Sequence, residues 1–225
     1  MCGRYTLSTV DGPDIAQRFG LLEPPVPETL GRANVCPTEQ IAVVVAPREI
    51  RAVPWGLRPF RGQRFAPINV RMETANSRFK FLMDGKRCLV LADGWYEWLK
   101  AEKKSAPRIP FRYTVDDDEL FAFAGLFGFA RIGEEWVTSA TILTTRANEV
   151  CAPVHDRMPV VLAGPDEEAA WLAGSDDPEL LVPFAAARTT VRPANPAVNR
   201  AGVEGPELIV PPPAEPEPEA QQTLL

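Results

Sequence analysis

Hydrophobic residues along this chain fall mostly into short runs separated by turn-forming residues, which predicts a fold built mainly from β-strands. Turns are predicted at Pro47 and Arg48, at Asp93 and Gly94, and at residues 116–119, where polar and turn-forming residues interrupt the runs. The runs that predict strands cover residues 41–46, 49–55, 87–92, 94–99, 109–115, 120–128, 135–144, 181–184 and 188–192.

Three segments predict short helices. Pro13 resembles a helix start and Gly20 a stop, which predicts a helix over 13–19, and similar patterns predict helices over 73–83 and 166–173. Because the strands outnumber the helices and mostly follow one another, we expect a β-rich α+β domain rather than a βαβ array. We expect antiparallel or mixed sheets, barrel-like, with a few short peripheral helices.

The last fifteen residues differ in composition from the rest. Residues 211–225 read PPPAEPEPEAQQTLL, a Pro- and Glu-rich segment that cannot bury apolar surface, so we expect one domain over 1–210 and a disordered tail. No run of about 18 apolar residues predicts a membrane span. The amino-terminal residues also lack the apolar run of a signal peptide, which predicts a cytoplasmic protein.

Charge is unevenly distributed. The net charge of −6 divides into +7 over residues 1–115, with 18 Lys and Arg against 11 Asp and Glu, and −13 over residues 116–225, with 6 against 19. Arginine dominates the basic half and suits bidentate contacts with phosphate. This distribution permits a nucleic-acid partner without requiring one.

Cysteine and histidine are too sparse to predict a disulfide scaffold or a metal site. The four cysteines form no C-x-x-C pair, and His155 is the single histidine. No candidate ligands fall at zinc-finger or helix spacing. We therefore expect neither a metal nor another cofactor.

Cys2 has a chemistry that no internal cysteine has. Its small side chain permits removal of Met1, after which Cys2 carries a free amine with a reference pKa of about 7.7–8.0 and a thiol of about 8.5. Such an aminothiol condenses with an aldehyde to an imine and then closes a thiazolidine ring. It also suits amide hydrolysis with the amine as base. Position alone leaves a third reading open, an incidental small residue at a frayed end.

Three further segments contain polar groups in settings that suit catalysis. In 93–98 (DGWYEW), alternation along a strand places Trp95 and Glu97 on one face, so that aromatic surroundings would raise the pKa of the carboxyl. His155 lies between two prolines and suits proton transfer. Asn69 and Arg71 share a face if their segment is extended, and together suit a sugar and a phosphate. Each of these segments alone also allows a structural interpretation. Glu97 could face solvent, His155 could be structural, and the segment with Asn69 could be a surface loop.

Taken together and in order, these segments resemble the SOS-response-associated peptidase family, whose members are also called abasic-site processing proteins. The resemblance rests on MCGRY at 1–5, RANVCPT at 32–38, PWGL at 54–57, NVRMET at 69–74, RCLVLADGWYEW at 87–98, LTTRAN at 143–148 and HDRMPVVL at 155–162. Val70 and Cys36 stand where the family commonly has alanine. Neither departure touches a proposed catalytic group.

The resemblance implies a function and a set of site residues. It implies that the protein forms a covalent thiazolidine crosslink to abasic sites in single-stranded DNA during the DNA damage response. Lyase and autopeptidase activity would be side reactions. We expect a monomer that is nucleoid-associated when crosslinked. Two alternatives stay open, a thiol peptidase or amidohydrolase and a non-catalytic single-strand binder. The implied catalytic residues are Cys2, Asn69, Glu97 and His155, and the implied DNA contacts are Arg4, Arg71, Arg157, Thr144 and Trp55.

Overall fold

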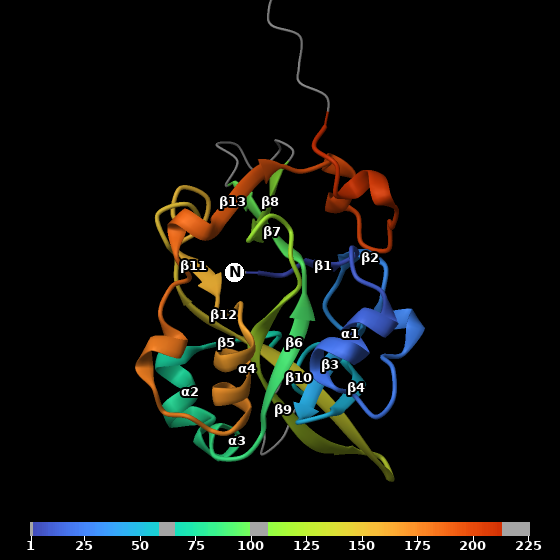
Figure 1. Cartoon of the computed structure of the whole chain (residues 1–225), viewed down its shortest axis with the longest axis vertical. Helices are drawn as coiled ribbons and strands as arrows, with labels where there is room; N and C mark the ends of the chain where they lie inside the picture. The colour runs from blue at the N-terminus through green and yellow to red at the C-terminus, as the bar shows by residue number, and fades with distance from the viewer. Residues whose placement is uncertain (1, 59–65, 100–107, 213–225) are drawn as a thin grey trace, which may run out of the picture.

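The strands form two sheets in the computed structural model, which describes residues 2–58, 66–99 and 108–212 (Figure 1). Neighbouring strands of the first sheet are antiparallel throughout. Its order is β13 (Thr189–Pro193), β8 (Ile109–Val115), β7 (Gly94–Leu99), β1 (Tyr5–Leu7) and β2 (Arg32–Val35).

The second sheet is larger and mixed. Two short strands lie off its main path: β12 (Val161–Leu162) pairs with β9, and β5 (Asn69–Arg71) runs parallel to β10. The main order is β11 (Arg157–Pro159), β10 (Glu135–Arg146), β9 (Phe121–Ile132), β6 (Arg87–Ala92), β3 (Gln40–Ala46) and β4 (Glu49–Pro54). Over the described ranges neither path returns to its first strand, so the molecule has two open sheets where a barrel-like closure was expected.

Within the described ranges, four short helices lie around the sheets. They are α1 (Gly12–Phe19), α2 (Met72–Arg78), α3 (Lys80–Met83) and α4 (Pro165–Leu172). Helix α1 follows its sequence signals, because the Asp11 side chain accepts a hydrogen bond from the Asp14 N–H and Gly20 ends the helix in the left-handed region. Five single 3₁₀ turns complete the described elements, at Pro27–Thr29, Pro178–Leu181, Ala186–Arg188, Pro196–Asn199 and Pro206–Leu208.

An aromatic cluster joins the two sheets. Tyr5 of β1 contacts Trp55 and Phe123 edge to face, with ring centroids 5.3 and 5.9 Å apart. Trp95 of β7 contacts Phe121 and Phe123 of β9 in the same way, at 6.2 Å. Edge-to-face rings add to the free energy gained by burying these side chains. The start of the chain is therefore anchored in the core.

The β-rich α+β class and most of the expected elements are confirmed. The strand expected at 181–184 is wrong, because a 3₁₀ turn ends at Leu181. The Asp177 side chain caps this turn by accepting a hydrogen bond from the Glu179 N–H, and Pro183 has no N–H to donate to a neighbouring strand. The helix expected over 73–83 breaks at Phe79 into α2 and α3. The tail expected from residue 211 lies outside the described residues from 213 onward.

Candidate active site

Cys2 lies fully buried just before β1, at the junction of the two sheets. Its carbonyl oxygen accepts a 2.5 Å hydrogen bond from the side-chain amide of Asn69, which β5 carries in from the second sheet. Its thiol donates to the Arg4 carbonyl at 3.5 Å. Cys2, the reactive residue proposed from the sequence, is therefore bound by groups from both sheets. The alternative interpretation, that Cys2 is exposed at a frayed end, is wrong.

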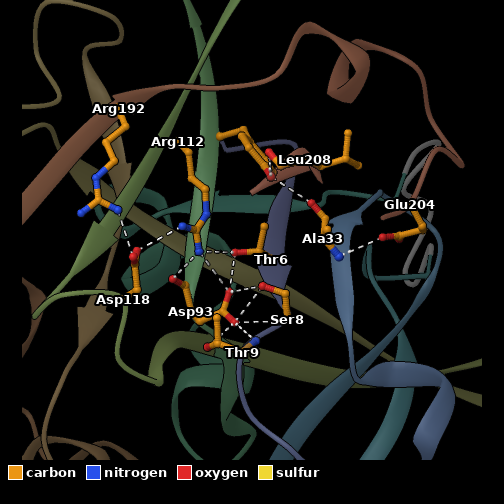
Figure 2. A network of polar contacts seen from close by, with 11 residues as sticks. Thr6, Ser8, Thr9, Ala33, Asp93, Arg112, Asp118, Arg192, Glu204 and Leu208 are labelled. Carbon is orange, nitrogen blue, oxygen red and sulfur yellow. Dashed lines mark hydrogen bonds and ion pairs between the residues drawn. The ribbon is translucent and has the colours of Figure 1, made fainter. Parts of the chain in front are cut away.

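A buried carboxylate fixes the segment that follows Cys2 (Figure 2). Asp93, at the start of β7, accepts hydrogen bonds from Thr6 Oγ1 at 2.5 Å and from the backbone N–H groups of Ser8 and Thr9 at 2.5 and 2.7 Å. The Arg112 guanidinium lies 3.6 Å away and balances the buried charge. This cluster, which we call the Asp93 clamp, sets β1 in register with β7.

The residue after Asp93 must be a glycine, because the strands pack too closely at Gly94 to leave room for a side chain. A Cβ at Gly94 would lie 2.9 Å from Thr6 Oγ1 and 3.0 Å from the Tyr113 carbonyl oxygen. Because real Cβ atoms rarely approach so closely, a larger residue would push β1, β7 and β8 apart. The close approach brings β7, with Glu97, near the amino terminus.

Glu97 points into the interior from β7 and is 3% exposed. It shares a strand face with Trp95, whereas Tyr96 and Trp98 lie on the other face and contact each other, as alternation predicted. Burial raises the pKa of the Glu97 carboxyl to about 7, the positive amino terminus opposes this rise, and Asp156 adds to it. The group can therefore gain or lose a proton near neutral pH.

The thiol of Cys2 is electrostatically linked to that carboxyl. Burial raises the pKa of the Cys2 thiol well above its ordinary value, and the negative charge of Glu97 raises it further. The thiol therefore keeps its proton at neutral pH until a base takes it. Glu97 is the carboxylate near enough to affect it, which suits a carboxylate that accepts the thiol proton.

His155 lies in a loop between β10 and β11, and its Nδ1 accepts a hydrogen bond from the Arg157 N–H at 3.0 Å. An N–H group can only donate, so a neutral ring carries its proton on Nε2. The Asp156 carboxylate also lies 3.0 Å from Nδ1 and becomes the partner if the ring is protonated. The loop thus allows His155 two protonation states with different partners.

The same loop is shaped by Asn148, which sequence reasoning did not single out. Its side-chain oxygen accepts from the N–H groups of Val150 and Cys151 at 3.1 and 2.9 Å. Its amide nitrogen donates to the Phe184 carbonyl and to Thr189 Oγ1 at 2.8 and 2.9 Å. The matching segment 143–148 contained this residue, but nothing in the sequence distinguished its buried amide from a surface one.

Strands β5, β10 and β11 lie side by side and bring three of the expected DNA-contact residues together. Thr144 of β10 is in register with Arg71 of β5 and is fully buried. Arg157 of β11 pairs with both carboxylate oxygens of Glu73, at 2.6 and 2.9 Å, and donates to the Thr144 carbonyl at 2.5 Å. These contacts lower the pKa of the Glu73 carboxyl. Arg71 is exposed and stays the best placed of the three for a phosphate.

Two other expected DNA contacts lie elsewhere. The Arg4 guanidinium donates to Asn34 Oδ1 and to the Val198 carbonyl, both at 2.7 Å. Trp55 is fully buried, and its indole N–H donates to the Ile68 carbonyl at 2.8 Å. Both side chains therefore bond to the backbone and side chains that surround the site. Their direct contact with DNA stays a prediction.

Cys151 and Tyr113 also border the site, although sequence reasoning missed them. Burial raises the pKa of both groups, and the charge of Glu97 raises each further. Within the described residues no group of three or more His, Cys, Asp and Glu side chains could hold a metal ion. No helix in the same ranges is long and apolar enough to cross a membrane.

Comparison with known proteins identifies relatives of this chain. The chain is 32% identical to the abasic site processing protein YoqW of Bacillus subtilis, over 93% of this chain and 99% of that protein. It is 31% identical to YedK of Escherichia coli, which carries the same description, over 94% and 100%. A solved structure of a Bacteroides thetaiotaomicron protein, 24% identical over 86% of this chain and 92% of its own, shares the fold with a TM-score of 0.74.

A family model described as SOS response associated peptidase matches residues 1–201, which include every residue of the candidate site. By that match and by these relatives, the chain belongs to the SOS response-associated peptidase family.

Proposed function

We propose that this protein processes abasic sites in DNA by trapping the open sugar aldehyde in a thiazolidine ring made by the amine and thiol of Cys2. The observation that carries the proposal is the placement of Cys2, whose carbonyl is held by Asn69 while its thiol lies within electrostatic reach of Glu97. The names of the relatives as abasic site processing proteins support the same lesion as substrate.

The reaction needs proton transfers but neither an oxidant nor a reductant. An abasic deoxyribose opens when the proton of its C1′ hydroxyl moves to the ring oxygen, which leaves an aldehyde. The Cys2 amine adds to C1′, and loss of one water gives the imine. The thiol then adds to the imine carbon and its proton ends on the nitrogen, so the products are a thiazolidine and one water.

Glu97 is suited to each of these transfers. Because its pKa lies near 7, it can accept a proton from the amine or thiol and return it to a departing oxygen. His155, with Nε2 as donor, would assist at the sugar oxygens and promote reversal of the crosslink. Asn69 would hold the terminus, since its Oδ1 is buried and has no partner among the described residues and can accept from the Cys2 amine.

Strand cleavage is the expected side reaction. An imine at C1′ acidifies the neighbouring carbon, so the 3′ phosphate can leave by β-elimination when the thiol does not close the ring. We therefore expect weak lyase activity, stronger in a variant that keeps the amine and lacks the thiol. The resemblance to the family implies single-stranded DNA as the partner, and an unpaired strand would let the sugar reach the buried Cys2 without the cost of opening a duplex.

The test measures the intact mass of the purified protein with and without an abasic oligonucleotide, and the adduct on a denaturing gel. Wild type should lack Met1 and gain the mass of the oligonucleotide less one water. Cys2→Ala should form no stable adduct, whereas the matched control Cys36→Ala should crosslink normally. Retention of an extra residue before Cys2 should also block the reaction, because the amine becomes an amide. A Cys2→Ala protein that crosslinks like wild type would overturn the mechanism.

A further inference from the structure

The hydroxyl of Tyr113 is buried and unpartnered at the edge of the candidate site. Tyr113 lies on β8, is fully buried, and its ring stacks on Trp95 with centroids 5.3 Å apart and planes 17° from parallel. Its Oη has no hydrogen-bond partner among the residues that the structure describes. A phenylalanine would pack the same way without burying an unpaired hydroxyl, so the oxygen itself calls for an explanation.

Strand register places this hydroxyl on the face that carries Glu97. In the antiparallel pair of β7 and β8, Tyr113 is opposite Trp95 and Phe111 is opposite Glu97. Opposite residues share a face, so Tyr113 and Glu97 are diagonal neighbours, a spacing that long aromatic side chains bridge. Tyr113 and Glu97 therefore project from neighbouring positions on one face, and the charge of Glu97 acts on the phenol.

The loop that carries His155 also reaches the surroundings of Tyr113. Burial raises the pKa of Tyr113, and the charges of Cys151, on that loop, and of Glu97 raise it further. The phenol therefore stays neutral and keeps its proton for donation. Its strand pairs with the strand of the proposed proton carrier, and the loop of the proposed histidine acts on it through Cys151.

The groups that the proposed reaction uses leave the free hydroxyl of the ring-opened sugar without a dedicated partner. Asn69 is committed to the Cys2 backbone, Glu97 moves protons, and the single Nε2 donor of a neutral His155 serves one sugar oxygen at a time. Ring opening of a deoxyribose releases a hydroxyl at C4′, three carbons from the aldehyde, and this hydroxyl must lose its hydration shell as the sugar enters a buried site. A neutral phenol can donate to such a group and accept from it.

We propose that the Tyr113 hydroxyl is a substrate-recognition group that binds a hydroxyl of the ring-opened deoxyribose and so favours the sugar aldehyde over an aldehyde without hydroxyls. This inference rests on the proposed function. It assigns to Tyr113 contact with the substrate rather than a share in the proton transfers. A site built to pair a substrate hydroxyl discriminates against an analogue that lacks it, because the site's own polar group is then left unpaired.

The experiment compares two single-stranded oligonucleotides of identical sequence, one with an abasic site and one with an aliphatic aldehyde tethered at the same position. Crosslinking rates at saturating DNA are measured for wild type, for Tyr113→Phe and for a matched control, Tyr96→Phe. Tyr96 lies on the opposite face of β7, and its hydroxyl donates to the Ala33 carbonyl at 2.9 Å. Its removal should lower stability and leave the ratio of the two rates unchanged.

Tyr113→Phe should slow crosslinking to the abasic site about 10-fold or more, change the rate with the tethered aldehyde less than twofold, and leave the melting temperature equal or higher. Equal slowing on both substrates, or slowing on neither, overturns the inference. A loss of melting temperature like that of Tyr96→Phe overturns it too, because the hydroxyl would then have a structural partner. Failure of wild type to crosslink either substrate refutes the proposed function, and the inference falls with it.

Discussion

The side-chain amide of Asn69 donates a 2.5 Å hydrogen bond to the carbonyl oxygen of Cys2, a residue 67 positions earlier in the chain. Asn69 is itself fixed, because β5 runs parallel to β10 and pairs Asn69 with Ile142. The contact therefore ties the segment before β1 to the larger sheet. A reactive group at a chain terminus needs such support, since proximity accelerates a reaction only when geometry is held.

Asn69→Ala should lower the rate of crosslinking to abasic single-stranded DNA by about 10- to 100-fold, because it removes both the donor to Cys2 and the acceptor for its amine. Affinity for an undamaged oligonucleotide should not change. The control is Asn76→Ala, an exposed asparagine on α2. Equal rates for the two variants would show that the Cys2 backbone needs no such support.

The rate of crosslinking should rise through pH 7. Burial raises the pKa of the Glu97 carboxyl to about 7, so its basic form is scarce at pH 6 and dominant at pH 8. Glu97→Gln should slow the reaction by about 10²–10⁴-fold, the usual contribution of a general acid or base. The variant should keep only the gentler rise that comes from the Cys2 amine. Rates measured between pH 5.5 and 9 test this, and an unchanged profile in the variant would exclude Glu97 as the proton carrier.

The same carboxyl should make stability depend on pH. Its pKa rises from 4.5 in the unfolded chain to about 7 in the fold, so the folded state binds the proton more tightly. Its contribution is fully present below pH 4.5 and is lost as the pH rises through 7, a difference of about 3 kcal/mol. Denaturant unfolding of wild type and Glu97→Gln at several pH values isolates this contribution. Parallel stability curves for the two proteins would contradict a buried titrating carboxyl.

Local pattern predicted the elements and the orientation of Glu97, but it did not predict the contacts between distant segments. Alternation of side chains along 94–99 was sufficient to place Trp95 and Glu97 on one face. The strands β1 and β5 are three residues each, too short for a pattern to stand out, and their pairing depends on partners far along the chain. The sequence pattern also could not predict the Asn69–Cys2 contact or the diagonal pair of Tyr113 and Glu97, because both depend on how distant strands pair.

The sequence identified which residues are basic, but it did not predict the partner that each arginine binds. Arg157 and Arg4 were assigned to DNA because they are basic and lie in matching segments. In the fold Arg157 is bound by Glu73, and Arg4 donates to Asn34, so each guanidinium is occupied within the protein. An arginine that fits a phosphate equally fits a carboxylate. Only the fold distinguishes these uses.

Asp93→Asn should destabilise the protein by about 3–5 kcal/mol, because the amide cannot accept all the clamp's hydrogen bonds and removes the fully buried partner of the Arg112 charge. The matched control is Asp118→Asn, a 30% exposed carboxylate that also pairs with Arg112 and should cost about 1 kcal/mol or less. Denaturant unfolding at pH 7 measures both. Equal losses for the two variants would mean that Asp93 contributes no more than a surface ion pair.

Arg71 is the arginine expected to bind a phosphate, since it is exposed beside the site and stands next to Asn69 and Thr144 in the paired strands β5 and β10. On single-stranded DNA each phosphate contact contributes about 0.7 to the slope of log affinity against log salt. Arg71→Ala should reduce that slope by about this amount and weaken binding at low salt to damaged and undamaged DNA alike. Arg131→Ala is the matched control, an exposed arginine on the β9–β10 hairpin, which projects at the end of the molecule away from the amino terminus (Figure 1). Affinities measured between 50 and 300 mM salt distinguish the two, and a slope that Arg71→Ala leaves unchanged would move the DNA path elsewhere on the surface.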